Sequence, residues 1–215
     1  QLVDGCGRIF RKVHPDFGRM FDAVRAKGYL DLESRKGKAP GGYQIVFDVE
    51  RMPFIFANAA GLHRDVETLL HEGGHAFHAL RCRHREPLFA RGHPLEFAEV
   101  ASMGMELLGQ PYLEEFYPKA DADRARAGHL EDLLTTYPWV ATIDAFQRWV
   151  YTHPGHARAD RKRAWLGLRR TLGGGEDWTG HADALAYGWH RQLHPFTVPF
   201  YYIEYGIAQT GALQV

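Results

Sequence analysis

The sequence predicts a mainly helical fold with a small antiparallel β-sheet. Apolar residues recur at spacings of three and four through most of the 215 residues, which is typical of helices that bury one face. Two short segments, YQIVFDV and PFIFANA, are rich instead in β-branched and aromatic residues and predict strands. A chain of this length that is 45% hydrophobic can enclose a sizeable core.

The first part of the chain, residues 1–60, is expected to form two helices followed by a hairpin. Pro15 opens the second helix, because proline is tolerated in a first helical turn. The segment ESRKGKAPGGY is expected to be a loop, and the two strand segments flank ERM. Pro53 and the apolar residues after it indicate a strand at a sheet edge. Free backbone groups of Phe56 and Ala57 are then expected to pair with an extended peptide.

The middle part, residues 61–110, is expected to contain two helices. From Leu62 to Cys82 the apolar residues form one stripe at helical spacing. Pro94 is expected to open the next helix, and Gly109 to close it.

The last part, residues 111–215, is expected to be helical and to end in an aromatic-rich segment, HPFTVPFYYIEYGIAQTGALQV. Helical spacing of apolar residues places its helices near 121–136, 138–152, 157–172 and 181–193.

Charge and composition disfavour several kinds of partner. Lys+Arg and Asp+Glu each number 26, so we expect no nucleic-acid and no membrane-surface partner. No apolar run approaches the roughly 20 residues that span a bilayer. The only two cysteines, Cys6 and Cys82, are too few for a disulfide framework and favour a reducing, cytoplasmic setting.

The segment LLHEGGHAFH contains three histidines and a glutamate, which are residue types that bind metals and transfer protons. His71 and His75 are four residues apart on a predicted helix, so both project from one face and can bind one tetrahedral zinc ion. Glu72 is turned about 100° around the helix and can reach a water molecule at that metal. Two ligands and a general base form the zincin signature. Gly73 and Gly74 cost roughly 1 kcal/mol each against alanine inside a helix, which predicts a close approach by another segment.

A catalytic zinc ion usually takes a third protein ligand. The metzincin pattern would place a histidine at position 81, which is Arg81, so that branch is excluded. The thermolysin-like pattern takes a glutamate from a second helix, and spacing alone does not choose among Glu96, Glu99 and Glu106. Glu99 and Glu106 lie about two turns apart on one face, so one can bind zinc while the other holds a ligand imidazole.

These motifs resemble the oligoendopeptidase F-like metallopeptidases, relatives of thimet oligopeptidase. The resemblance covers nearly the whole chain and is carried by HEGGHAFH, FAEVASMGMELL, YLDLESRKGKAPGGY, PFIFANAAG and PFYYIEYGIAQ. It implies a zincin-type helical metallopeptidase catalytic domain over residues 1–215, corresponding to the C-terminal half of a longer chain. The N-terminal helical half, which walls the substrate channel in the family, would then be a partner within the same protein.

The resemblance also implies roles for individual residues. The zinc ligands of the family correspond to His71, His75 and Glu99. The general base of the family corresponds to Glu72, and the glutamate that holds a zinc-binding imidazole corresponds to Glu106. In the closing segment the family uses histidine and tyrosine side chains against the substrate and the oxyanion. The corresponding residues are His194, Tyr201 and Tyr205, with Tyr202 as a further substrate contact.

The expected activity is zinc-dependent hydrolysis of internal bonds in short peptides, with Glu72 activating the attacking water. One alternative is an exopeptidase of the HExxH class, which would carry a fixed group for a substrate terminus. Another is a non-catalytic, zinc-stabilised peptide-binding module, in which Glu72 would be dispensable. A third is a chain that folds but is inactive alone, because half of the channel would be missing.

Overall fold

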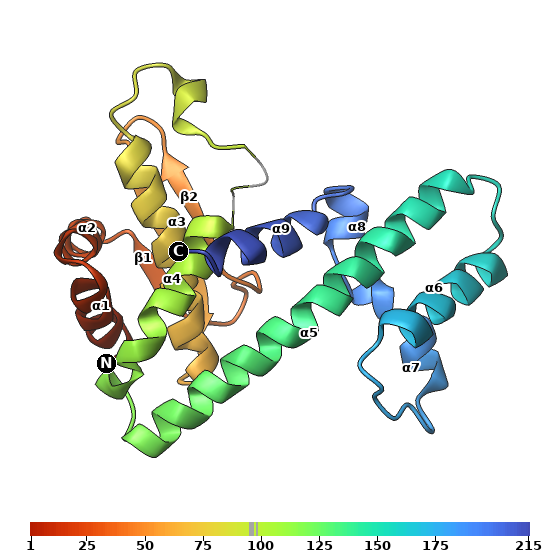
Figure 1. The fold of residues 1–215 in the computed structure, drawn as a ribbon. Coiled ribbons are helices and arrows are strands. Elements are labelled where there is room, and N and C mark those ends of the chain that lie inside the picture. Colours follow the sequence, from red (N-terminus) through yellow and green to blue (C-terminus); the bar gives the residue numbers. More distant parts are fainter. Residues whose placement is uncertain (95–96, 98) are drawn as a thin grey trace. The chain divides into compact units, whose positions relative to one another are not determined.

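The structure is a computed structural model that describes residues 1–94, 97 and 99–215 (Figure 1). The chain divides into two compact units: residues 1–127 with 208–215, and residues 128–207. Helices dominate both units, and the described strands form one small sheet. The predicted mainly helical fold with a small sheet is therefore confirmed.

The first unit begins with the two predicted helices, α1 (Leu2–Val13) and α2 (Pro15–Ala26). Pro15 occupies the first turn of α2, as predicted, and the preceding His14 caps that helix through its side chain. Both helices contribute to the core: the Phe10 ring lies 4.9 Å from the Phe21 ring and 4.8 Å from the Phe77 ring. This aromatic cluster fixes α1 and α2 against the helix that carries Phe77.

The sheet contains β1 (Leu30–Glu33), β2 (Tyr43–Phe47) and β3 (Met52–Ala59) in the order β1-β3-β2. β2 and β3 form the predicted antiparallel hairpin, but β1 pairs with β3 in parallel. The sheet is therefore mixed, and the prediction of a purely antiparallel sheet is wrong in this respect. β1 has only four residues, too few for a clear alternation of apolar and polar positions.

The prediction that β3 is an edge strand is wrong, because β3 lies between the other two strands. Pro53 is tolerated there because β1 pairs with β3 only from Ile55 onwards. Phe56 pairs with both neighbouring strands and is only 9% exposed, and Ala57 is also buried. The reason for expecting Phe56 and Ala57 to pair with a substrate backbone therefore no longer holds.

The loop between β1 and β2 is anchored to the sheet by Lys38. Its ammonium group donates to the carboxylate of Asp31 and to backbone carbonyl groups of β1 and β3, and its side chain is only 1% exposed. Asn58 of β3 donates to the carbonyl group of Gly41 at 2.8 Å. These contacts hold the loop in place beside the helix that follows the sheet, where Gly42 lies against Thr68.

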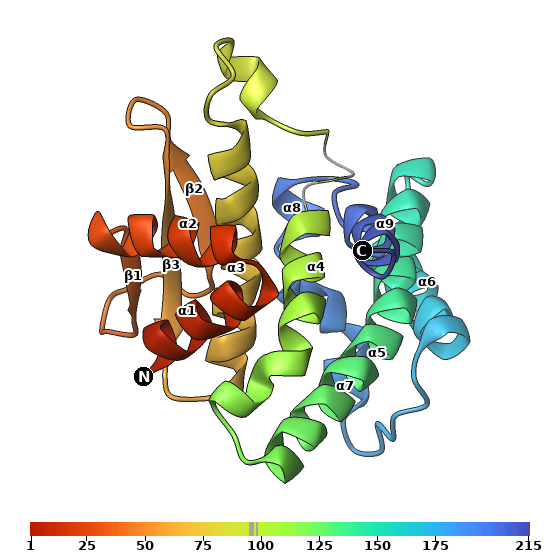
Figure 2. The same cartoon turned by 60° about the vertical axis from the view of Figure 1, so that its left-hand side comes forward.

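That helix, α3 (His63–Cys82), confirms the predicted helical stripe. Figure 2 shows it beside α4 (Val100–Gly109), with the sheet on its other side. The prediction that α4 begins at Pro94 is wrong: Glu99 takes the cap position directly before the helix. The candidate ligand Glu96 lies outside the described residues. The described residues of this part also form the short 3₁₀ helices η1 (Leu88–Arg91) and η3 (Gln110–Glu115).

The second unit is built on α5 (Lys119–Thr152), which also extends into the first unit. Two separate helices were predicted here, but one helix runs through Pro138 without ending. A proline removes one helical hydrogen bond, and packing can keep the rest of such a helix intact. The buried core of the unit is formed by Ile143, Phe146 and Trp165.

The remaining helices follow the prediction only in part. α6 (Arg158–Leu172) matches its prediction, whereas the helix expected near 181–193 is divided into α7 (Ala182–Ala186) and η4 (Gly188–Arg191). The aromatic closing segment forms α8 (His194–Thr197) and α9 (Ile203–Ala212). No helix in the described part of the chain is both long and apolar enough to cross a membrane.

Candidate metal centre

Two helices of the first unit bring together one cluster of metal-binding side chains. The ligand atoms of His71 and His75 on α3, and of Glu99 before α4, all lie within 4.8 Å of one another. Glu99 Oε2 is 3.2 Å from His71 Nε2 and 3.3 Å from His75 Nε2. Ligands bound tetrahedrally to zinc at 2.0–2.1 Å are about 3.3 Å apart. Both separations to the carboxylate therefore fit a single zinc ion.

Glu106 fixes the orientation of one of the two imidazoles. Its Oε1 lies 2.6 Å from His71 Nδ1. Because a carboxylate oxygen accepts, Nδ1 donates this hydrogen bond, which leaves Nε2, 3.2 Å from Glu99 Oε2, as the nitrogen that would bind a metal. This arrangement matches the way proteins orient a histidine that binds a metal.

The carboxylates make the cluster favourable for positive charge. Burial alone would lower the pKa of His71, but its hydrogen bonds with Glu106 and Glu99 outweigh burial and raise this pKa to about 10. Burial alone would raise the pKa of Glu99, but hydrogen bonds with His71 and His75 hold it far below its usual range. The same charges would stabilise a divalent cation bound between these groups.

The two glycines of the motif permit the close contacts that build the cluster. A Cβ atom on Gly74 would lie 2.3 Å from the carbonyl oxygen of Ala101 and 2.6 Å from Ser102 Cα, both in the first turn of α4. A Cβ atom on Gly73 would lie 2.4 Å from the ring of Phe10. The predicted close approach to both glycines is confirmed, and at Gly74 it brings the start of α4 against α3.

Glu72 is the buried carboxylate next to the cluster. It is 5% exposed, and its Oε2 atom has no hydrogen-bond partner among the described residues. Burial raises the pKa of Glu72, a shift that the neighbouring imidazoles His71 and His75 oppose. A Cβ atom on Gly42 of the β1–β2 loop would lie 3.5 Å from Glu72 Oε1, an ordinary contact distance, so this loop passes directly beside the carboxylate.

The predicted histidine and tyrosine group lies in the second unit. His194 Nε2 is 3.2 Å from the hydroxyl group of Tyr205, and its ring lies 5.8 Å from that of Tyr201 and 5.2 Å from that of Tyr202. The indole N–H of Trp139 donates to the Tyr202 hydroxyl group at 2.9 Å. The structure thus gathers all four predicted residues, and their role toward a substrate stays a prediction.

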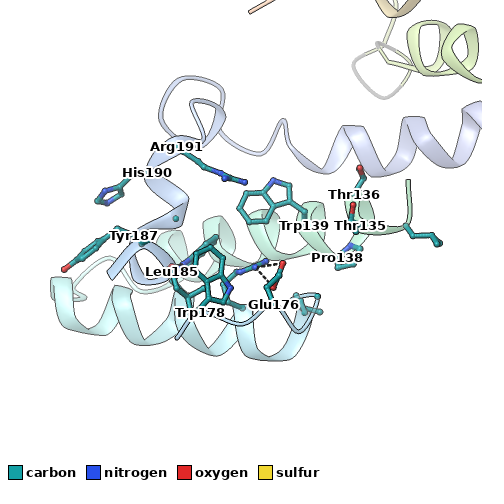
Figure 3. Close-up of a pocket in the computed structure, with 17 residues that line it drawn as sticks. Thr135, Thr136, Pro138, Trp139, Glu176, Trp178, Leu185, Tyr187, His190 and Arg191 are labelled. Atoms are coloured by element: carbon teal, nitrogen blue, oxygen red, sulfur yellow. Dashed lines mark hydrogen bonds and ion pairs between the residues drawn. The ribbon is translucent and has the colours of Figure 1, made fainter. Parts of the chain in front are cut away.

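A pocket of about 960 Å³ also lies wholly within the second unit (Figure 3). Two guanidinium groups flank the Trp139 ring, that of Arg169 at 5.4 Å and that of Arg191 at 5.3 Å. Arg169 is paired with Glu176 at 3.1 Å. Since none of the predicted site residues is among the described residues that line it, this pocket is not the candidate catalytic site.

Comparison with known proteins identifies the family. Residues 12–215 match Peptidase family M3. The chain belongs to that family. The predicted resemblance to the oligoendopeptidase F-like peptidases is confirmed by relatives that carry this name.

One relative of this M3 chain is the chromosomal oligoendopeptidase F of Lactococcus lactis subsp. cremoris, 29% identical over 101 residues, or 46% of this chain and 17% of that protein. PZ peptidase A, solved with an inhibitor, is 36% identical with a TM-score of 0.92. An oligoendopeptidase F from Bacillus anthracis str. Ames is 30% identical with a TM-score of 0.82. These two structures match 99% of this chain, which covers only 38% and 35% of their respective chains.

Two residues that support the candidate metal centre were missed by sequence reasoning. Ser102 donates its hydroxyl group to Glu99 Oε2 at 2.9 Å and thereby holds the candidate third ligand. Lys38 anchors the loop that carries Gly42 to the position beside Glu72. A lone serine or lysine carries no spacing pattern, so no signal in the sequence would have found either one.

Proposed function

We propose that this M3 chain is a zinc-dependent endopeptidase that hydrolyses internal bonds of short peptides. The observation that carries the proposal is the cluster of His71, His75 and Glu99, with the buried carboxylate of Glu72 beside it. Two imidazoles and one carboxylate are the ligands of thermolysin-type catalytic zinc, whereas structural zinc sites usually take four protein ligands. The peptidase and oligoendopeptidase relatives support a peptide substrate.

In this proposal His71, His75 and Glu99 hold the zinc ion, while Glu106 and Ser102 orient His71 and Glu99 respectively. Bound zinc would supply a Lewis acid that polarises a peptide carbonyl group and lowers the pKa of water from 15.7 to roughly 7. These supporting hydrogen bonds keep the ligand set in one geometry, which improves metal affinity and catalysis in such sites.

Glu72 is the proposed general base. Its carboxylate takes a proton from the attacking water and later passes it to the leaving amine. Burial raises the pKa of Glu72, and a base is most effective when its pKa lies near the working pH. Its Oε2 atom accepts no hydrogen bond from any described residue, so that oxygen is free to receive a proton.

The edge strand β2 is the proposed guide for the substrate backbone, in place of β3. Among the described strands β2 pairs only with β3, so its other edge carries backbone N–H and C=O groups that no other strand uses. Gln44 and Val46 of this strand line the same pocket as His75, so the strand runs beside the metal cluster. Pairing along a strand selects extended peptides largely without regard to side chains.

In this proposal the histidine and tyrosine group supplies hydrogen-bond donors to the oxyanion that develops during the reaction. Donors to a developing oxyanion are typically worth about 3–4 kcal/mol each in the barrier. Tyr205→Phe and His194→Gln are therefore expected to lower kcat by roughly 10²–10³-fold with zinc content unchanged, if these residues supply such donors. An unchanged kcat would remove them from the mechanism.

The test uses a short internally quenched peptide with both ends blocked, in the presence and absence of zinc. Zinc-dependent cleavage is expected for an endopeptidase. Cleavage of only the unblocked form would instead identify an exopeptidase. A zinc-stabilised binding module would gain thermal stability with zinc and cleave neither peptide.

The solved relatives are longer than this chain, and we propose that their additional length completes the substrate channel. Activity that appears only when that part is supplied would support this proposal. The cytoplasmic location and the lack of nucleic-acid and membrane partners stay predictions.

A further inference from the structure

A smaller pocket of about 340 Å³ opens beside His75 in the first unit. It is bounded by β2, the end of α3 and the segment that contains η1. Gln44 and Val46 face it from alternate positions of the edge strand. The stacked rings of His78 and His93, 4.8 Å apart, form its wall. A peptide lying along β2 with a bond at the metal cluster would therefore place a neighbouring side chain in this pocket.

Three arginines line this pocket, Arg51, Arg83 and Arg91, and all are half-buried. Guanidinium groups keep their charge at any physiological pH. One carboxylate, that of Asp48, belongs to the described residues that line the pocket. The lining therefore carries a net positive charge before any histidine is counted.

Few of these positive charges are balanced by neighbouring carboxylates. Arg51 Nη1 lies 3.6 Å from an oxygen of Glu86, but that side chain is 83% exposed and the pair is weak. In the described part of the chain Arg83 has no carboxylate partner, and its guanidinium group contacts His84 and Met52. Among the described residues, Arg91 donates only to the backbone carbonyl groups of Arg85 and Glu86.

Half-buried like charges repel one another unless an anion lies between them. A cavity lined by one sign of charge also concentrates ligands of the opposite sign. Guanidinium groups match carboxylates especially well, because two N–H donors can bind the two carboxylate oxygens. The chemistry of this pocket thus selects a carboxylate.

We propose that this basic pocket binds a carboxylate of the peptide substrate, so that peptides with an acidic side chain near the scissile bond are preferred. The inference rests on the proposed function, since the metal cluster decides where the scissile bond lies. Successive residues of an extended peptide advance about 3.3 Å, so the acidic residue is expected within about two positions of that bond. The carboxylate of a free C-terminus has the same chemistry and is the second source to be tested.

The test measures peptide binding to zinc-loaded protein with Glu72→Gln, which removes the proposed base and so prevents turnover. An end-blocked peptide with one glutamate, moved through each position, is compared with the same peptide carrying glutamine. The glutamate peptide is expected to bind about tenfold more tightly at one or two adjacent positions, as a charge-assisted hydrogen bond implies. A glutamine peptide with a free C-terminus shows whether the terminal carboxylate is the better ligand.

Arg83→Gln is expected to abolish the preference for glutamate, and Arg83→Glu to reverse it in favour of lysine. Arg11→Gln is the matched control: it removes one positive charge from an exposed arginine that pairs with Asp22 and does not line the pocket. Circular dichroism and zinc content confirm that each variant is folded. If the Arg83→Glu protein does not fold, Arg91→Gln is tested in its place.

A glutamate preference that Arg83→Gln removes and Arg11→Gln retains supports the inference. Equal binding of glutamate and glutamine peptides, no measurable binding of either, or a preference that survives Arg83→Gln and Arg91→Gln would overturn it. Failure of the proposed function is seen separately, as a zinc-loaded wild type that cleaves no peptide. The binding measurement decides the role of the pocket in either case.

Discussion

Gly74→Ala is expected to damage the metal cluster without touching any ligand. The added methyl group would meet the backbone of α4 at Ala101 and Ser102, at 2.3 Å and 2.6 Å. Backbone atoms cannot rotate away as a flexible side chain can. Relief therefore requires α3 and α4 to separate.

The size of that movement follows from the contact distances. An ordinary contact begins at 3.4 Å, so the carbonyl oxygen of Ala101 must retreat by about 1 Å. Glu99 lies two residues earlier and would move with it, whereas ligand distances tolerate only about 0.2 Å. Overpacking of this kind costs about 1–3 kcal/mol of stability. Zinc affinity should fall by at least the roughly 10–100-fold seen when support for a ligand is lost.

Zinc affinity is measured by competition with a chelator, and stability by urea unfolding of the metal-free protein. Gly104→Ala is the control on α4, because a Cβ atom there would meet no described atom within 4 Å. It should leave zinc affinity unchanged and raise stability by up to about 1 kcal/mol through helix propensity. Wild-type zinc affinity in Gly74→Ala would refute the proposed coupling between the two helices.

Three further predictions concern groups around the site. Glu106→Gln should weaken zinc binding by roughly 10–100-fold, measured by chelator competition, because His71 loses its charged partner. Zinc binding near neutral pH should release about one proton, because the pKa of about 10 keeps metal-free His71 protonated. Zinc affinity should therefore rise with pH until that pKa is passed. Calorimetry in buffers of different ionisation enthalpy measures the proton release and the affinity. Lys38→Met should cost about 1–3 kcal/mol in urea unfolding, because the partly buried carbonyl groups of Asp31 and Ala57 lose their donor. Lys36→Met, at an exposed position, should cost little.

Local chemistry was predictable where a few neighbouring residues determine it. The spacing of His71, Glu72 and His75 fixes their directions on any helix, and the cost of Gly73 and Gly74 indicated close packing. The third ligand depends on contacts between distant segments, so spacing left Glu96, Glu99 and Glu106 all open as candidates. In the structure the contact at Gly74 and the hydroxyl group of Ser102 bring Glu99 to the imidazoles.

The wrong predictions about the fold also arose where contacts between distant segments decide the structure. β3 was placed at a sheet edge because Pro53 suggested it, but the parallel pairing with β1 depends on four residues far along the chain. The spacing of apolar residues predicted separate helices near 121–136 and 138–152, but α5 continues through Pro138. Sequence patterns describe neighbours along the chain, whereas strand order and helix continuity depend on what packs against them.

The most direct test of the proposed mechanism compares wild type and Glu72→Gln, both loaded with zinc, on the end-blocked quenched peptide. The expected result is cleavage by the wild type and none by the variant, with equal zinc content in the two proteins. Loss of activity together with loss of zinc would point to a disturbed metal site rather than a lost base. Cleavage by Glu72→Gln at the wild-type rate would contradict the assignment of Glu72 as the general base.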